Sequence, residues 1–293
     1  MEEILVIPLR WRGKSAVSLR RLYGTDKAAA LEFLDRDPVN AVLARVNVER
    51  MGLGPASALA KYNDAQEITA LAWDGGNVIP LGFTPAGLDE LADSLLSRRR
   101  IASSFVGPAT QVMGLWERTR HDWGPARDIR SCQLSMVMDR PSAVAPDSLV
   151  RPARFAEAGL VLPASVAMFT EEVGYDPMIY GNSYAHRVST LISAGHTFVR
   201  VENDALTGQP RVIFKADIGA LAGGVAQIQG VWTAPDRRGQ GIATHAMAAV
   251  VSHILENIAP TVSLYVNNYN LRAVQVYKKV GFTRREDWAT ILL

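Results

Sequence analysis

The chain is poor in cysteine, in net charge and in long apolar runs. Its single cysteine, Cys132, excludes an internal disulfide framework and a zinc site made of cysteines. A formal net charge of +2 provides no bulk attraction to nucleic acid or to a membrane surface. No apolar run reaches the roughly 18 residues that a membrane-spanning helix needs. We expect no metal, because His186, His196, His245 and His253 show no ligand spacing.

The N-terminus also lacks the features of a secretory signal. Glu2 and Glu3 precede a short apolar stretch, which reverses the order of charge in a signal peptide. We therefore expect a cytoplasmic protein. The 293 residues, 48% of them hydrophobic, are enough for one large domain or for two of ordinary size.

Residues 225–249 contain a strand, a glycine-rich turn and a helix. Val225 to Thr233 interleaves apolar and β-branched residues with glutamines, as a strand does. Pro235 stops this strand, and Arg238-Gly239-Gln240-Gly241 then opens a helix with apolar residues on one face. Such a turn leaves the first helical N–H groups unpaired at the positive end of the helix dipole. The stretch predicts an anion site, and we expect the anion to be a pyrophosphate.

Known phosphate motifs narrow this prediction. A Walker loop needs Gly-Lys-Ser/Thr, which this turn lacks, and a dinucleotide fingerprint needs glycine or alanine where this chain has Thr244. Arg238 to Ala243 instead satisfies R/Q-x-x-G-x-G/A, and it resembles the acetyl-CoA pyrophosphate loop of the GNAT N-acetyltransferases. A later stretch, LYVNNYNLRAVQVYKKVGF, resembles the second signature of that family, with Asn270 as the N-cap of a helix over Leu271 to Lys279.

The resemblance implies an α/β (α+β) fold of two tandem GNAT-like domains, each a mixed, mostly antiparallel sheet flanked by helices. We expect a GNAT acetyltransferase domain over residues 148–293 and a degenerate GNAT-like domain without cofactor over residues 1–140. In the first half the turn from Phe83 to Gly87 has one glycine, no arginine and a proline where a phosphate-facing N–H is needed. An unrelated α/β cap is the alternative for this half. The whole chain resembles actinobacterial tandem GNAT proteins with an uncharacterised N-terminal domain.

The resemblance also implies acetyl-CoA as the acyl donor. Backbone N–H groups from Gly239 to Ala243 would hold the pyrophosphate, because glycine lets phosphate oxygens approach the main chain. The pantetheine arm would pair with a strand edge that splays near Val231 to Thr233. Arg238 would add positive charge, or it is a solvated surface arginine. The predicted cofactor-binding residues are Val231, Thr233, Arg238, Gly239, Gln240, Gly241, Ile242, Ala243, Asn270 and Tyr277.

Acyl transfer to an amine needs a proton donor for the departing thiolate. Tyr277 matches the position of the donor in the family, and it shares one helix face with Val274 and Asn270. A phenol with a pKa of about 10 can protonate a thiolate with a pKa of about 8.5. A buried aromatic residue with a purely structural role is the alternative for Tyr277.

The proton acceptor is harder to place. The polar residues of the strand before the turn are Gln227 and Gln229, which cannot usefully accept a proton. We choose Glu172 as the catalytic base over its neighbour Glu171, since paired acids near the acceptor entrance would attract a cationic amine. A solvated helix end is the alternative. Lys215 and Asp217 on another strand are further residues that could face the site.

Two functions follow from these residues. The first is an acetyl-CoA-dependent N-acetyltransferase that moves the acetyl group directly to a protein lysine, a protein N-terminus or a small amine. Direct transfer is expected because no nucleophile is placed for a covalent intermediate. The alternative is a non-catalytic acyl-CoA-binding sensor or regulatory protein. The absence of a carboxylate on the strand that carries Gln227 and Gln229 favours this alternative. The sequence makes no prediction of oligomeric state.

Overall fold

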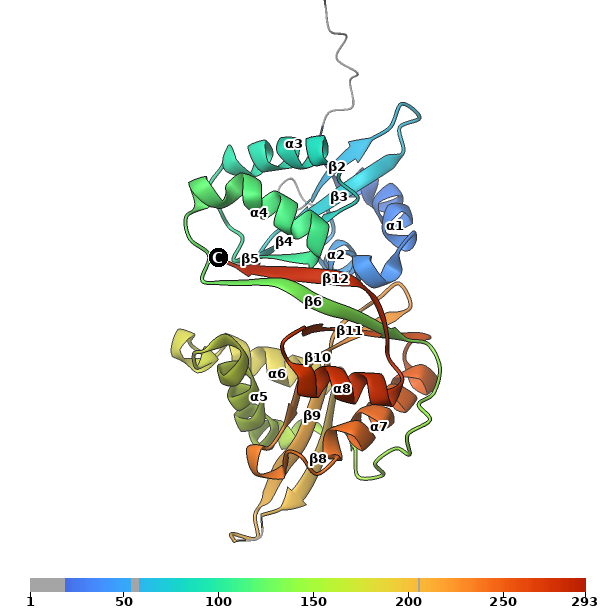
Figure 1. The fold of residues 1–293 in the computed structure, drawn as a ribbon, viewed down its shortest axis with the longest axis vertical. Helices are drawn as coiled ribbons and strands as arrows, with labels where there is room; N and C mark the ends of the chain where they lie inside the picture. Colours follow the sequence, from blue (N-terminus) through green and yellow to red (C-terminus); the bar gives the residue numbers. More distant parts are fainter. Residues whose placement is uncertain (1–18, 54–57, 205) are drawn as a thin grey trace, which may run out of the picture.

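A computed structural model describes residues 19–53, 58–204 and 206–293 of the chain. In these ranges the strands form one twelve-stranded sheet, in the order β1-β2-β3-β4-β5-β12-β6-β11-β10-β9-β8-β7. Helices cover the sheet, and the two halves of the chain lie at opposite ends of an elongated molecule (Figure 1). The predicted strand residues 17, 18 and 57 lie outside the described residues.

The first half alternates helices with the strands of one end of the sheet. Its elements are β1 (Arg20–Arg21), the 3₁₀ helix η1 (Gly24–Asp26), α1 (Lys27–Asp35), α2 (Pro38–Met51), β2 (Ala58–Tyr62), β3 (Ile68–Asp74), β4 (Asn77–Leu81), α3 (Pro85–Leu96), β5 (Ser104–Pro108), α4 (Ala109–Trp123) and β6 (Asp128–Met138).

The second half repeats this order with two additional 3₁₀ helices. Its elements are β7 (Arg151–Pro152), η2 (Phe155–Glu157), α5 (Ala158–Val173), η3 (Pro177–Tyr180), α6 (Ser183–Ser193), β8 (Thr197–Asn203), β9 (Pro210–Ala222), β10 (Val225–Thr233), η4 (Pro235–Arg237), α7 (Ile242–Asn257), β11 (Thr261–Asn267), α8 (Leu271–Val280) and β12 (Thr283–Leu292). The repeat confirms a tandem arrangement and not an unrelated cap.

Each half has one parallel pair of neighbouring strands at the same point of its order. β4 pairs with β5 in parallel, and β10 pairs with β11 in parallel. The other registered pairs of the described strands are antiparallel. The expected mixed, mostly antiparallel sheet is therefore observed. In each half, the parallel pair is the point of the sheet at which two neighbouring strands can separate.

The last strand of each half lies beside strands of the other half. β6 pairs with β11 from Val262↔Met138 to Asn267↔Gln133, and β12 pairs with β5 from Trp288↔Pro108 to Leu292↔Ser104. Between them β12 and β6 also pair with each other. The ranges 1–140 and 148–293 remain our proposal for the repeated units of sequence, whereas the sheet runs unbroken across that boundary.

The helix α7 fixes the direction of the glycine-rich turn because its apolar face is buried. Ala246, Val250 and Ile254 are at most 1% exposed and belong to the main core, which also contains Phe198 and Phe214 of the sheet. Because this apolar face packs on the sheet, the N-terminus of α7 has a fixed position relative to the strands. Among the described residues no helix is both long and apolar enough to span a membrane.

The corresponding turn in the first half is closed by its own side chains. Thr84 caps α3, since its Oγ1 accepts a hydrogen bond from Gly87 N at 3.1 Å. The side chain of Gln111 accepts a hydrogen bond from Phe83 N at 2.8 Å and donates one to Phe83 O at 3.0 Å. Backbone groups at this turn are thus satisfied within the protein.

Candidate active site

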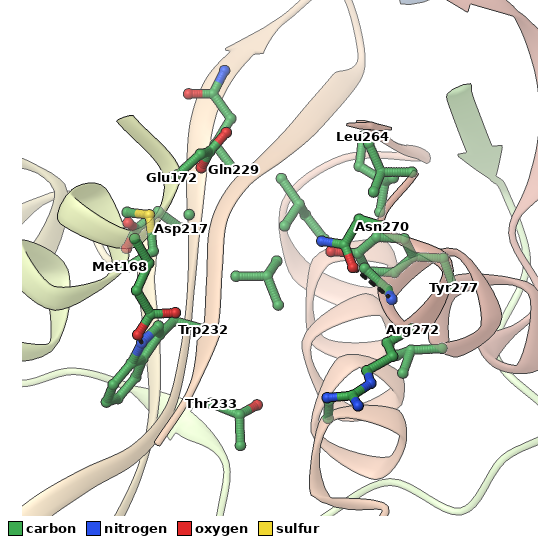
Figure 2. Close-up of a pocket in the computed structure, with 18 of the residues that line it drawn as sticks. Met168, Glu172, Asp217, Gln229, Trp232, Thr233, Leu264, Asn270, Arg272 and Tyr277 are labelled. Carbon is green, nitrogen blue, oxygen red and sulfur yellow. Dashed lines mark hydrogen bonds between the residues drawn. The ribbon is translucent and has the colours of Figure 1, made fainter. Parts of the chain in front are cut away.

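A cavity of about 1410 Å³ lies where β10 and β11 separate. The two strands pair only from Val225↔Thr261 to Gln227↔Ser263, and beyond that point residues 228–233 and 264–267 both line the cavity. Helices α5 and α6 contribute one wall, and α7 and α8 contribute the other. Figure 2 shows Glu172, Asp217 and Trp232 across the cavity from Asn270 and Tyr277. The predicted splay near Val231 to Thr233 is thus observed.

The glycine-rich turn forms one end of this cavity. Gly239 and Gly241 both have a φ of +77°, a region that side chains with a Cβ rarely adopt. An added Cβ at either position would meet nothing within 4 Å. The backbone conformation itself therefore requires glycine here, in addition to the approach of phosphate that the sequence led us to expect.

The helix that follows begins without a side-chain cap. α7 starts at Ile242, and Gly241 at its N-cap position has no side chain to accept a hydrogen bond. The first backbone N–H of the helix that donates to another described residue is that of Thr244, which reaches Gly241 O at 3.0 Å. The preceding amides are available to an anion, at the positive end of the helix dipole.

Nine of the ten predicted cofactor-binding residues line the cavity, and Gln240 is the exception. The side chain of Gln240 donates to Asp236 O at 3.3 Å and accepts from Arg237 Nε at 3.3 Å, so it closes the turn. Arg238 lines the cavity but is engaged, because it donates to Thr233 O at 2.9 Å and its Nη2 lies 2.7 Å from Oε2 of Glu171.

Tyr277 is buried in the wall that α8 contributes. The residue is 7% exposed and lines the cavity, and its ring packs edge-on against Phe282 at 5.9 Å between centroids. Burial, with a smaller contribution from the negative charge of Glu172, raises the pKa of Tyr277 well above its ordinary value. The phenol of Tyr277 is therefore neutral at any physiological pH. Asn270 caps the same helix as predicted, since its Oδ1 accepts from Ala273 N at 3.2 Å.

Glu172, the predicted base, lines the opposite wall and is held by an arginine from the first half. Arg130 of β6 places its Nη1 3.0 Å from Oε1 of Glu172 and donates from Nη2 to the backbone oxygen of Glu172 at 2.9 Å. Arg130 also pairs with Asp128 at 2.8 Å. The side chain of Glu172 stays 50% exposed, so one of its oxygens remains available to a substrate or to water.

Gln133 is a cavity residue that the sequence did not identify. It is 2% exposed, and its Nε2 donates to Oδ1 of Asn267 at 3.0 Å while its Oε1 accepts from Thr290 Oγ1 at 2.7 Å. These bonds join β6, β11 and β12. No local signal in the sequence indicated this role, because it depends on the exchange of strands between the halves.

Comparison with known proteins agrees with this geometry. Residues 166–282 match the acetyltransferase (GNAT) family, and residues 57–161 match a domain of unknown function, DUF4081. A mycothiol acetyltransferase of Thermobispora bispora is 23% identical over 290 residues, which are 97% of this chain and 86% of that protein.

Solved structures share the fold over nearly the whole chain. An acetyltransferase of the GNAT family from Colwellia psychrerythraea has a TM-score of 0.55 and 12% identity, covering 94% of this chain and 98% of that one. A tandem GNAT protein from the clavulanic acid biosynthesis pathway has a TM-score of 0.53 and 14% identity, covering 94% and 97%. Both motifs lie within residues 166–282, and the match identifies this part of the chain as an acetyltransferase domain of the GNAT family.

Proposed function

We propose that the cavity binds acetyl-CoA and that the protein transfers its acetyl group directly to an amine. The observation that carries this proposal is the open N-terminus of α7 at one end of a cavity that continues between two separated strands. The first feature suits an anionic diphosphate, and the second suits an extended amide-bearing arm.

Backbone groups at two places and the side chain of Arg238 would hold the donor. The N–H groups of residues 239–243 would bind the pyrophosphate, and the free edge of β10 from Val231 to Thr233 would pair with the pantetheine amides. Because Glu171 engages Arg238 in this structure, the pyrophosphate would compete with that carboxylate for the arginine. At the thioester, the N–H of Val231 would donate to the carbonyl oxygen as negative charge develops there.

Tyr277 and Glu172 would move the two protons of the reaction. Glu172 would take a proton from the incoming ammonium, directly or through a water, and leave a neutral amine. The amine nitrogen attacks the thioester carbon, the C–S bond breaks with its electron pair passing to sulfur, and Tyr277 gives its phenolic proton to that sulfur. The second proton of the attacking nitrogen leaves as the amide forms, and through water it restores the phenol of Tyr277. Since the two residues lie on opposite walls, the donor thioester and the acceptor amine would meet between them (Figure 2).

The acceptor is proposed to be an amine, either small or part of a protein. The likeness to a mycothiol acetyltransferase puts a mycothiol-type small amine among the acceptors to test. A non-catalytic acyl-CoA sensor is the second candidate, because Gln227 and Gln229 bond to each other at 3.1 Å and β10 offers no carboxylate between them.

Two measurements test the proposal together. Calorimetric titration with acetyl-CoA, longer acyl-CoAs and free CoA measures binding, and release of the CoA thiol in the presence of an amine panel measures transfer. We expect binding of acetyl-CoA and amine-dependent release of CoA. Binding without release for any amine would favour the sensor, and no binding of any acyl-CoA would contradict both functions.

A further inference from the structure

A fully buried lysine lies behind the strand that borders the cavity. Lys215 of β9 is 0% exposed, and its Nζ lies 2.6 Å from Oδ2 of Asp217 and donates to Gly230 O at 3.2 Å. The second oxygen of Asp217 accepts from Thr197 Oγ1 at 2.9 Å. Burying an ammonium group is costly unless it is paired and hydrogen-bonded. Lysine at this position therefore needs a reason beyond packing.

The lysine contacts a break in the ladder between β9 and β10. The register runs from Gln229↔Asp217 directly to Trp232↔Lys215, so Gly230 and Val231 form a bulge without ladder partners. The Nζ of Lys215 supplies the hydrogen bond that the ladder does not supply to Gly230 O. The charged pair thus replaces a ladder hydrogen bond at one of the two register shifts between β9 and β10.

The orientation of one peptide follows from this contact. In a planar trans peptide the C=O and the following N–H point in opposite directions. Because Gly230 O points toward Lys215 on the β9 side, the N–H of Val231 points to the other side, where β11 has already separated. Both residues line the cavity. The N–H of Val231 therefore faces the gap between the strands.

The peptide between Gly230 and Val231 keeps its orientation only if another group binds it. Its φ of +58° and its missing side chain leave the peptide free to rotate unless another group holds it. A Cβ on Gly230 would lie 3.0 Å from Asp217 Oδ2 and 3.0 Å from Met168 Cε, so the bulge packs closely on the charged pair.

We propose that Lys215, paired with Asp217, is a positioning residue that holds the Gly230–Val231 peptide with its N–H aimed at the carbonyl oxygen of the bound thioester. The lysine acts through the backbone and touches neither substrate. This inference rests on the proposed function, because it assigns a role in the same transfer. It predicts that the charge of Lys215 serves the chemical step and not the affinity for the donor.

The test compares wild type with Lys215→Met and with the double variant Lys215→Met/Asp217→Asn. Methionine keeps the length of the stem, and the double variant leaves no unpaired buried carboxylate, so it keeps the fold even if the single variant does not. We expect kcat of the double variant to fall by about tenfold or more, a part of what losing a donor to the developing oxyanion costs. The KM for acetyl-CoA and the affinity for free CoA should stay within about twofold.

A spectroscopic readout separates positioning from stability. Isotope-edited infrared spectra of acetyl-CoA labelled with ¹³C at the carbonyl should show a lowered C=O stretch on wild type, and this shift should be absent from the double variant. The control is Arg98→Met/Asp74→Asn, which removes a partly buried ion pair of the first half and should lower Tm while leaving kcat and the C=O stretch unchanged.

The outcomes distinguish this inference from the proposed function. If wild type neither binds acetyl-CoA nor releases CoA, the proposed function fails. If wild type does both, and the folded double variant shows the same kcat and the same carbonyl stretch, the positioning role of Lys215 is wrong. A fall in kcat that tracks Tm equally in the control and in the double variant would also overturn it.

Discussion

At the scale of single residues, the site combines a buried tyrosine phenol with a carboxylate that is paired with an arginine. Tyr277 lies in the apolar wall of α8, where burial keeps its phenol neutral. Glu172 is oriented by Arg130, which belongs to the other half of the chain. Tyr277 and Glu172 are thus positioned by contacts with residues outside their own helix turns. A substitution of either functional group should therefore change the rate of transfer without changing the binding of acetyl-CoA.

Tyr277→Phe should lower kcat by about 10²-fold, the scale of losing a general acid. The affinity for acetyl-CoA should change little, because phenylalanine keeps the ring that packs against Phe282. Steady-state kinetics with calorimetry measures both quantities. Equal kcat for the two proteins would remove Tyr277 from the mechanism.

Tyr265 should make the protein less stable at high pH. Burial raises the pKa of Tyr265 to about 12 from an ordinary value of 10.0. Between these values the unfolded chain ionises the phenol while the folded protein keeps it neutral, so the free energy of unfolding falls as the pH rises. Thermal unfolding from pH 9 upward should show a smaller fall of Tm for Tyr265→Phe than for wild type.

An exposed tyrosine provides the control for this pH dependence. Tyr269 is 69% exposed, and Tyr269→Phe should leave the dependence of Tm on pH unchanged. The phenylalanine at 265 can still stack on Trp288, which lies 5.0 Å away between centroids. Identical curves for Tyr265→Phe and wild type would show that the Tyr265 phenol ionises equally in both states.

At the scale of elements, the same turn between strand and helix occurs twice with opposite outcomes. After β10 the turn has two glycines in the left-handed region and the helix begins uncapped. After β4 the turn is capped by Thr84, and Gln111 satisfies the backbone of Phe83. The difference lies in which side chains are present to accept from or donate to the backbone, since the surrounding order of strands and helices is repeated.

Gly241→Ala should weaken acetyl-CoA binding more than it weakens the fold. A φ of +77° costs an L-residue roughly 1–2 kcal/mol, and relief of this strain would turn the amides away from the anion. We expect a clear rise in Kd for acetyl-CoA by calorimetry, with Tm lowered by a few degrees.

Gly124 is a control for the backbone cost alone. It follows α4 in the first half, and an added Cβ would meet nothing within 4 Å. Its φ of +77° and ψ of −172° lie in a region that is almost restricted to glycine, whereas Gly241 has a ψ of −4° in the left-handed region. Gly124→Ala should therefore lower Tm at least as much as Gly241→Ala and leave the Kd for acetyl-CoA unchanged. An unchanged Kd for Gly241→Ala would contradict the role of the turn in anion binding.

At the scale of the whole molecule, the exchange of β6 and β12 joins the halves into one sheet. β6 covers the edge of β11, places Gln133 in the lining of the cavity and places Arg130 against Glu172. The first half thus contributes to a site that the second half was expected to form alone. β12 in return covers the edge of β5. Each half depends on the other for its last strand.

A fragment of residues 148–293 should therefore fail to fold on its own. Without β5 and β6, one edge of β11 and both edges of β12 would be unpaired, which favours aggregation. We expect the fragment to be insoluble or to lack binding of acetyl-CoA, and we expect co-expression with residues 1–147 to restore both properties. A soluble, monomeric fragment that binds acetyl-CoA with the affinity of the full chain would contradict this.

The sequence by itself determined the local features of this protein. The turn from Arg238 to Ala243, the cap at Asn270 and the helix that carries Tyr277 are encoded within a few residues, because glycine, capping and periodicity act over short distances. The same short-range signals predicted the repeated order of elements and therefore the tandem fold.

Only the tertiary structure decided how the halves share strands and what surrounds the site residues. Pairing of β6 with β11 joins residues far apart in the chain, and strand pairing leaves no local signal that names the partner. For the same reason, the tether of Glu172 to Arg130, the place of Gln133 and the hold of Lys215 on Gly230 were not predictable. Each of them depends on which side chains meet across a sheet whose order the sequence does not state.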